Sequence, residues 1–141
     1  MKFSLWRENG ALNSRPVFDA FANSLVGAGH DVVDNDSSSD VDVIWSVLWH
    51  GRMAANKRIW QDNQHNKKPT IVLEVGGIKR GTTWKVGLNG INRDAYFGPT
   101  GNDYTRANKL GLHLKNWRTE GNYILICGQH EKSQQWEMMP N

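Results

Sequence analysis

The residues most able to do chemistry lie together in segment 71–81, IVLEVGGIKRG. The segment combines a β-branched apolar run, one acid, three glycines and two cations: Ile71–Val75, Glu74, Gly76, Gly77, Lys79, Arg80 and Gly81. A strand that runs into a glycine-rich loop leaves backbone N–H groups free to point at a phosphate or carboxylate, and the cations supply the opposite charge. The pattern therefore predicts a site for an anionic ligand just beyond a strand. The open alternative is a structural turn whose cations are solvated.

Side chains that follow the loop extend this predicted ligand-binding site. They are Trp84, Lys85 and Asn89. The loop sequence GGIKRG is neither a P-loop, which needs GxxxxGK before Ser or Thr, nor the dinucleotide fingerprint GxGxxG. Because the pattern itself names no ligand, the prediction depends on the position of the loop after a buried strand.

Glu74 is the first candidate for catalysis, since it lies near the end of the apolar strand. Partial burial would raise the pKa of its carboxyl group, which could then act as a general base or bind ligand hydroxyls. The alternative is that Glu74 pairs with Lys79 or Arg80 and fixes the turn.

The sequence Trp49-His50-Gly51-Arg52 supplies the second candidate. It follows another predicted strand and opens a helix, so it is expected at the same edge of the sheet as the glycine loop. His50 could act as a base there, and Arg52 could bind a phosphate or carboxylate at the helix N-terminus. A solvated histidine beside a structural arginine is the alternative.

Other site chemistries find no support in the sequence. The histidines His30, His65, His113 and His130 lack metal-ligand spacing. Ser46 lies within a predicted strand and lacks the GxSxG elbow of serine hydrolases. Cys127, the single cysteine, lies in the apolar run YILIC and is expected to be an inert buried thiol. We therefore expect no metal and no cofactor.

Composition indicates one globular domain that covers residues 1–141. The formal net charge of +3 is far below the dense Lys/Arg stripe of a dedicated duplex-binding protein, so nucleic acid is a possible but not a favoured partner. No apolar run is long enough to span a membrane, and the first residues do not resemble a signal peptide. These features favour a cytoplasmic protein.

Hydrophobic patterning predicts an alternation of strands and helices. The expected strands are Lys2–Arg7, His30–Asp34, Val41–Trp49, Thr70–Val75, Thr82–Leu88 and Asn122–Cys127. Three helices are expected. The first begins at Asn13 or Ser14 and ends at Gly27, and the other two run over Gly51–Asn66 and Tyr104–Leu114. This order predicts an α/β fold, a single Rossmann-like domain whose mostly parallel sheet carries helices on both faces.

Four segments give the chain a family resemblance. They are AGHDVVDND (28–36), DVDVIWSVLWHGR (40–52), KPTIVLEVGGIKRGTTWKVGLNGIN (68–92) and NYILICGQHEKSQQW (122–136). With these segments the chain resembles the N-terminal half of a GT-B glycosyltransferase of the kind found in phage and marine bacterial genomes. The resemblance implies a domain that holds the acceptor, and a second Rossmann domain that holds the nucleotide-sugar. Residues 128–141 look like the start of that second domain.

Three functions are therefore open at this point. The first is a glycosyltransferase-like domain that binds a sugar or nucleotide-sugar and needs a separate second GT-B half, or a homodimer, for transfer. The second is a non-enzymatic domain that binds nucleotides or other small anions at the same edge. The third is a nucleic-acid-binding module that uses phosphate contacts from Lys67, Lys68, Lys79, Arg80 and Lys85.

Overall fold

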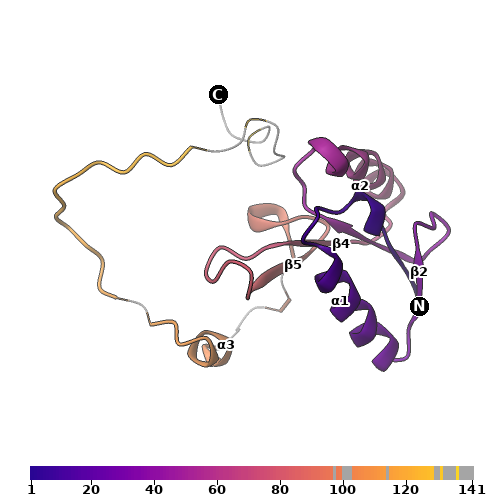
Figure 1. Cartoon of the computed structure of the whole chain (residues 1–141), viewed down its shortest axis with the longest axis horizontal. Coiled ribbons are helices and arrows are strands. Elements are labelled where there is room, and N and C mark those ends of the chain that lie inside the picture. Colours follow the sequence, from indigo (N-terminus) through magenta and orange to yellow (C-terminus); the bar gives the residue numbers. More distant parts are fainter. Residues whose placement is uncertain (97, 100–102, 114, 129–130, 132–135, 137–141) are drawn as a thin grey trace. The chain divides into compact units, whose positions relative to one another are not determined.

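The structure is a computed structural model of the chain, and it describes all residues except 97, 100–102, 114, 129–130, 132–135 and 137–141. Its described residues fall into two compact units. The main unit contains residues 1–96, and the second lies within Gly98–Gln129. The main unit holds the sheet and two long helices, which Figure 1 shows in indigo to pink.

The main unit is built on a five-stranded sheet. Its strands are β1 (Lys2–Leu5), β2 (Asp31–Asp34), β3 (Val41–Trp45), β4 (Thr70–Val75) and β5 (Trp84–Leu88). The spatial order is β2-β1-β3-β4-β5; the first four strands are parallel, and β5 returns antiparallel to β4. The predicted α/β class with a mostly parallel sheet is confirmed. The sheet is mixed because a short hairpin, without a crossover helix, joins β4 to β5.

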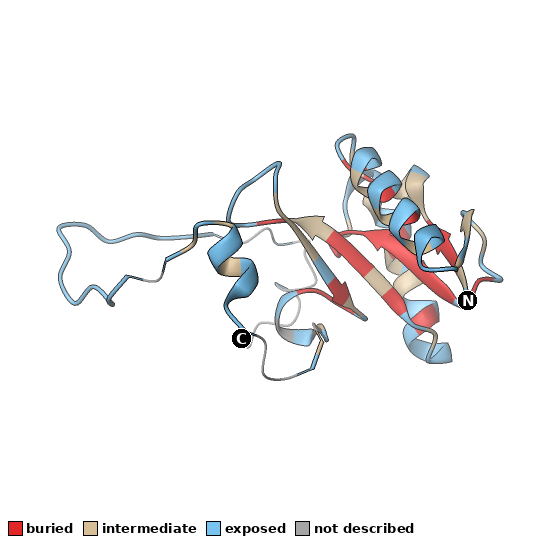
Figure 2. Cartoon of the chain, turned by 90° about the horizontal axis from the view of Figure 1, so that it is seen from below, coloured by how far each residue is buried: buried red, intermediate tan, exposed pale blue. Residues whose placement is uncertain are grey.

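Two long helices cover opposite faces of the sheet. They are α1 (Arg15–Gly27) and α2 (Ala54–Asn66), and a shorter helix, α3 (Thr105–Lys109), lies in the second unit. On one face, Phe18 of α1 packs in a cluster with Val43. On the other face, Ile59 of α2 packs against Ile44. Since neighbouring residues of a strand point to opposite faces, the two helices sandwich β3, whose residues are all buried. Figure 2 shows the buried residues concentrated on the strands between the helices.

The link from β2 to β3 differs from an ordinary parallel crossover, because it contains no helix. Instead, residues 35–40 run back along β1. The amide of Asp36 donates to Ser4 Oγ at 2.8 Å, and the amide of Asp40 donates to the Lys2 carbonyl at 2.9 Å. Ser4 and Lys2 share the face that α2 covers elsewhere, since they alternate with Phe3, which belongs to the α1 cluster. This part of the α2 face is therefore covered by a short polar loop.

Short turns of 3₁₀ helix follow three of the strands. They are η1 (Arg7–Asn9) after β1, η2 (Gly51–Met53) after β3 and η3 (Asn92–Asp94) after β5. The predicted third strand, Val41–Trp49, ends early at Trp45 because Ser46 adopts a left-handed conformation with φ of 64°. The predicted helix over Gly51–Asn66 is confirmed as η2 followed by α2.

The predictions for the chain beyond residue 103 were less successful. The expected strand Asn122–Cys127 is wrong, because these residues are irregular in the structure. The side chains of residues 123–126 are exposed, and Cys127 is exposed rather than buried. The expected helix Tyr104–Leu114 is shorter, and Leu114 lies outside the described residues. Within the described part of the chain, no helix has the length and apolar character needed to span a bilayer.

Candidate functional site

The carboxyl edge of the sheet contains a switch point between β1 and β3. From β1 the chain crosses through α1 to β2 on one side, and from β3 it crosses through α2 to β4 on the other side. The two connections diverge, and such a divergence opens a crevice where α/β proteins bind ligands. The structure has a cavity of about 440 Å³ here, which we call the edge cavity. Its walls come from the residues that follow β1, β2 and β3: Arg7, Glu8, Gly10, Ala11, Leu12, Ser14, Arg15, Asp34, Asn35 and Arg52.

Three arginines surround the edge cavity, and they differ in their ties to the protein. Arg7 is fixed, because its Nε donates to Asp34 Oδ1 at 2.7 Å and its Nη1 pairs with Asp19. Its guanidinium also lies 5.9 Å from the ring centroid of Phe18. Arg15 and Arg52 are exposed and form no ion pair with any residue that the structure describes. The charges of these two arginines are therefore available to an anion.

The N-terminus of α1 adds to the positive potential of the edge cavity. The first turn of this helix contains no acidic residue. Of the two predicted starts, Asn13 and Ser14, the N-cap is Ser14, but its hydroxyl donates to the Ala11 carbonyl at 2.7 Å and caps no helical N–H group. The positive end of the helix dipole is therefore not matched by a carboxylate of its own first turn. Gly10 allows the backbone before α1 to lie close to the Ser14 side chain, since a Cβ atom at position 10 would lie 2.2 Å from Ser14 Oγ.

The glycine loop after β4 is the turn of the β4–β5 hairpin. The Gly76 amide donates to the Thr83 carbonyl at 2.9 Å, and the Lys79 amide donates to Thr83 Oγ1 at 3.2 Å. These amides are bonded inside the loop and are not free for a ligand. Gly77, Arg80 and Gly81 are exposed. The loop lies at the carboxyl end of β4, but none of its residues lines the edge cavity.

The other residues predicted around the glycine loop have structural contacts. A side-chain oxygen of Glu74 accepts from the Val75 amide at 2.7 Å, and Glu74 forms no ion pair with a described residue. The expected pairing of Glu74 with Lys79 or Arg80 is therefore absent. Trp84 packs in the α1 cluster, 6.0 Å between ring centroids from Trp45. Lys85 donates from Nζ to Asn92 Oδ1 at 2.8 Å.

Asn89 and His50 lie apart from the edge cavity. Asn89 accepts from the Thr70 amide at 2.9 Å and donates its own amide to the Thr70 carbonyl, so it lies at the start of β4. The antiparallel direction of β5 explains this position, because the end of β5 meets the amino end of β4. His50 is exposed and does not line the cavity. Of the predicted site residues, Arg52 is the one that lines it.

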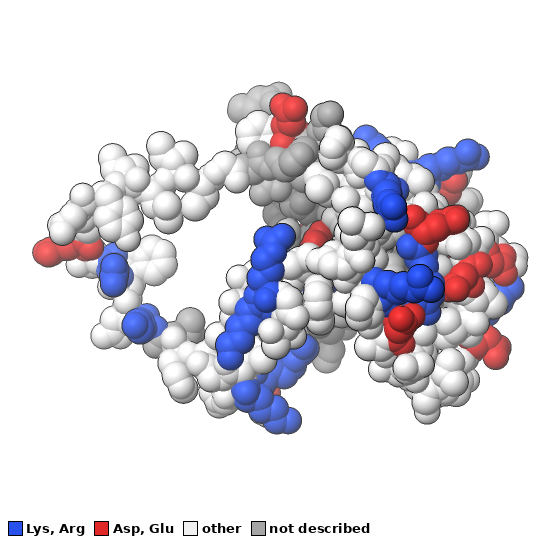
Figure 3. Space-filling view, viewed as in Figure 1, with Lys and Arg blue, Asp and Glu red and all other residues white. Residues whose placement is uncertain are grey.

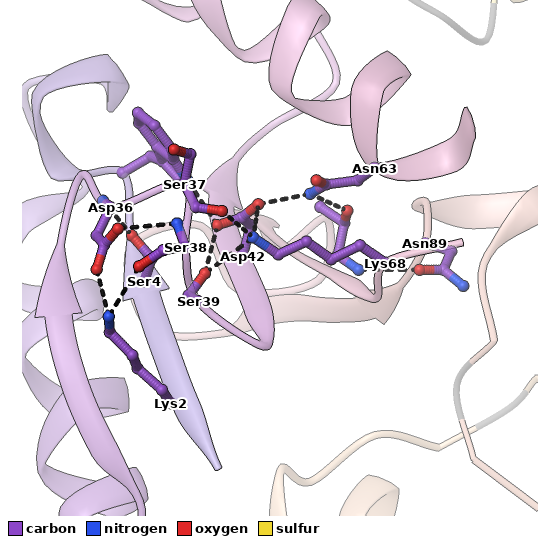
Figure 4. Close-up of polar contacts among 12 residues, drawn as sticks. Lys2, Ser4, Asp36, Ser37, Ser38, Ser39, Asp42, Asn63, Lys68 and Asn89 are labelled. Carbon is purple, nitrogen blue, oxygen red and sulfur yellow. Dashed lines mark hydrogen bonds and ion pairs between the residues drawn. The ribbon is translucent and has the colours of Figure 1, made fainter. Parts of the chain in front are cut away.

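A buried ionic network under α2 was not predicted from the sequence. Asp42 of β3 is 2% exposed, and its carboxylate accepts four side-chain bonds. Oδ1 binds Trp6 Nε1 at 3.0 Å and Ser39 Oγ at 2.9 Å. Oδ2 binds Asn63 Nδ2 at 2.7 Å and Lys68 Nζ at 2.9 Å. Figure 4 shows Ser39 of the polar loop, Asn63 of α2 and Lys68 converging on Asp42 of β3. The available signal was an aspartate inside an apolar strand, because buried aspartate is rare unless it is paired.

The polar loop 35–40 carries the clearest electrostatic effect on a single group. The side chain of Lys2 bonds to Asp36 and the Ser38 amide donates to its carboxylate at 2.8 Å, as Figure 4 shows. These interactions, the lysine first, hold the pKa of Asp36 well below its usual range. The Asp36 carboxylate therefore stays ionised at low pH, and its ion pair with Lys2 holds the loop against β1.

Neither the metal-ligand geometry nor the comparison with known proteins identifies the ligand of this site. Among the described residues, no group of three or more His, Cys, Asp or Glu side chains is arranged to hold a metal ion. Comparison of the chain with protein-family models, with curated proteins and with solved structures gave no match.

Proposed function

We propose that this chain is a Rossmann-like domain of glycosyltransferase type that binds a sugar nucleotide, or a related anionic sugar, in the edge cavity. The observation that carries the proposal is the position of Arg15 and Arg52. Both arginines lack an ionic partner among the described residues and line a cavity at the switch point of the sheet. Arg15 begins α1 and Arg52 lies in η2, and two arginines beside the N-terminus of α1 favour a phosphate or carboxylate group.

The chemistry of the lining residues suggests which part of the ligand each residue would bind. Arginine binds phosphate through two parallel N–H groups, so Arg15 and Arg52 would hold the anionic part of the ligand. Glu8 also lines the cavity and would accept hydrogen bonds from hydroxyl groups. Arg7 is held by Asp34 and would shape the wall rather than move toward the ligand. In this proposal the domain binds one substrate, and a second domain or subunit completes the transfer site.

The test is a calorimetric titration of the full chain with UDP-glucose, UDP, inorganic phosphate and glucose. We expect the double variant Arg15→Ala/Arg52→Ala to bind UDP-glucose at least about tenfold more weakly, because each arginine contributes charged hydrogen bonds of about 1.5–3 kcal/mol. The matched control is Lys79→Ala/Arg80→Ala, which also removes two cations but lies outside the cavity. Equal loss in both double variants, or no binding of any anionic ligand, would overturn the proposal.

The surface charge favours a small anion over nucleic acid. On the face shown in Figure 3, lysine and arginine side chains are interspersed with aspartate and glutamate in the right-hand part of the picture, and an elongated group of basic side chains lies nearer its centre. The formal net charge is nevertheless only +3, which is low for a protein that binds nucleic acid. Phosphate-backbone binding would also weaken steeply with salt. A titration with single-stranded oligonucleotides at two salt concentrations separates these possibilities.

A further inference from the structure

The α2 face carries a second cavity, which we call the α2 groove. Its volume is about 590 Å³, within the range of about 300–1,000 Å³ typical of small-molecule sites. The residues that line it include Trp6 and, from α2, Arg58, Ile59, Asp62, Asn63 and Asn66. It is a different cavity from the edge cavity, and the η1 turn carries residues of both walls.

The α2 groove exists because the crossover from β2 to β3 contains no helix. In a sheet of this kind a parallel crossover usually places a helix beside its neighbour. Here the polar loop 35–40 lies over β1 instead, and Ser37 of this loop lines the groove opposite α2. The space beside α2 is therefore left open.

The floor of the groove is rigid and electrically neutral. Lys68 uses all three ammonium protons, on Asp42 Oδ2 at 2.9 Å, Ser37 O at 3.1 Å and Ser39 Oγ at 3.0 Å. Its charge is matched by Asp42 beneath it. Since the lysine has neither a free proton nor an unmatched charge, the floor offers no anchor for an anion.

One acceptor on this floor, Asn63 Oδ1, has no hydrogen-bond partner among the residues that the structure describes. The residue is 5% exposed, and its Nδ2 group donates both protons, to Asp42 Oδ2 at 2.7 Å and to Thr70 Oγ1 at 2.9 Å. Its Oδ1 atom accepts no hydrogen bond from any residue that the structure describes. Asn63 Oδ1 is not among the buried unpaired polar atoms of the described residues, so a molecule in the groove can reach it, and it can accept a hydrogen bond from a donor there.

The remaining walls combine an aromatic surface with balanced charge. Trp6 lines the groove, and its one polar atom is already bonded to Asp42, so the indole offers carbon to a ligand. On α2, Arg58 Nε lies 3.6 Å from Asp62 Oδ2, so the opposite charges of these two side chains balance each other. Asn66 adds an amide that can both donate and accept. Such walls suit an uncharged molecule that carries many hydroxyl groups and apolar C–H faces.

From this chemistry we propose that the α2 groove binds a neutral carbohydrate. A sugar C–H face packs on Trp6, one hydroxyl donates to Asn63 Oδ1, and others bond to Asp62 and Asn66. The proposal is independent of the edge cavity, since it needs neither Arg15 nor Arg52.

The test is an NMR titration of the full chain with maltotriose, cellotriose and triacetylchitotriose. We expect at least one sugar to shift the Trp6 indole N–H and the Asn63 side-chain signals saturably. Asn66→Ala and Asp62→Ala should each weaken that binding at least about fivefold. The matched control is Gln64→Ala, another exposed amide on α2 that does not line the groove.

Two outcomes would overturn the proposal. One is the absence of saturable shifts at Trp6 and Asn63 with every sugar while the protein remains folded. The other is a preference of the groove for adenosine or inorganic phosphate over all three sugars. Arg15→Ala/Arg52→Ala should leave sugar binding in the groove unchanged, so this result and the failure of the edge cavity are distinguishable.

Discussion

Asp42 is the residue whose carboxylate holds together the α2 side of the main unit. Four side chains bond to it, and three of them, Trp6, Asn63 and Lys68, also line the α2 groove. Removal of one partner from a buried ion pair leaves the other charge uncompensated. Asp42 is therefore expected to set both the stability of the unit and the geometry of the groove.

The first prediction concerns Asp42→Asn. The substitution keeps the size of the side chain but leaves the charge of Lys68 unmatched, so the free energy of unfolding should fall by about 3–5 kcal/mol. Urea denaturation followed by fluorescence measures this change. The matched control is Asp62→Asn, which breaks the exposed pair with Arg58 and should have little effect. Similar losses in the two variants would show that Asp42 is not the buried anchor that the geometry indicates.

The second prediction is a pH dependence at Asp36. Because the folded state lowers the pKa of Asp36, its stabilisation is present above its usual value of 3.8 and is lost as the pH falls toward the lower folded value. Asp36→Asn should therefore lower stability at neutral pH and flatten the acid limb of the stability profile below about pH 4. The control is Asp31→Asn, an exposed aspartate without a side-chain hydrogen bond to a described residue. A wild-type acid limb in Asp36→Asn would contradict the assignment.

Single residues were the hardest features to predict from the sequence. Arg52 was identified because it closely follows a strand. Arg15 was missed because it reads as an ordinary first residue of a helix, and its role depends on where β2 and β3 end. Asp42 was missed because three of its partners, Trp6, Asn63 and Lys68, are far from it in the chain, and sequence spacing does not show such long-range contacts.

The β4–β5 hairpin is the element whose predicted role changed most. Its glycines suggested a ligand loop, but the structure shows an internally bonded turn beside the sheet edge. Gly76 and Gly77 are adjacent yet differ in surroundings. A Cβ atom at Gly76 would lie 2.3 Å from the Thr83 carbonyl oxygen, whereas nothing lies within 4 Å of one at Gly77.

The third prediction follows from this difference. Gly76→Ala must displace the Thr83 backbone and should destabilise the main unit by about 1–3 kcal/mol. Gly77→Ala, its matched control, meets no neighbouring atom and should be tolerated. Urea denaturation of both variants measures the difference. Equal stability of the two variants would show that the hairpin closes differently.

The central strands of the main unit were predictable because they are largely buried. Runs such as Thr70–Val75 are apolar and β-branched, as expected of strands covered by helices on both sides. The same signal at Asn122–Cys127 gave a wrong strand. An apolar pattern shows that a segment could form a buried strand. It does not show that a neighbouring strand is available for that segment to pair with.

For the molecule as a whole, the exposed apolar run 123–126 has the greatest consequence. Tyr123, Ile124, Leu125 and Ile126 are at least 76% exposed, and contiguous apolar surface of this kind promotes association. We predict that the chain self-associates at micromolar concentration and that Ile124→Lys/Ile126→Lys shifts it toward the monomer. Sedimentation velocity measures both. A monomeric wild-type protein at these concentrations would contradict the prediction.

The central claim is that the edge cavity holds an anionic sugar ligand. The most direct measurement is the set of backbone amide shifts when UDP-glucose is titrated into the full chain. We predict the largest saturable shifts within residues 10–15, most of which line the cavity, and at Arg52, which also lines it, and small shifts at residues 76–81 in the hairpin. Largest shifts in the hairpin, or no saturable shift at residues 10–15, would contradict it.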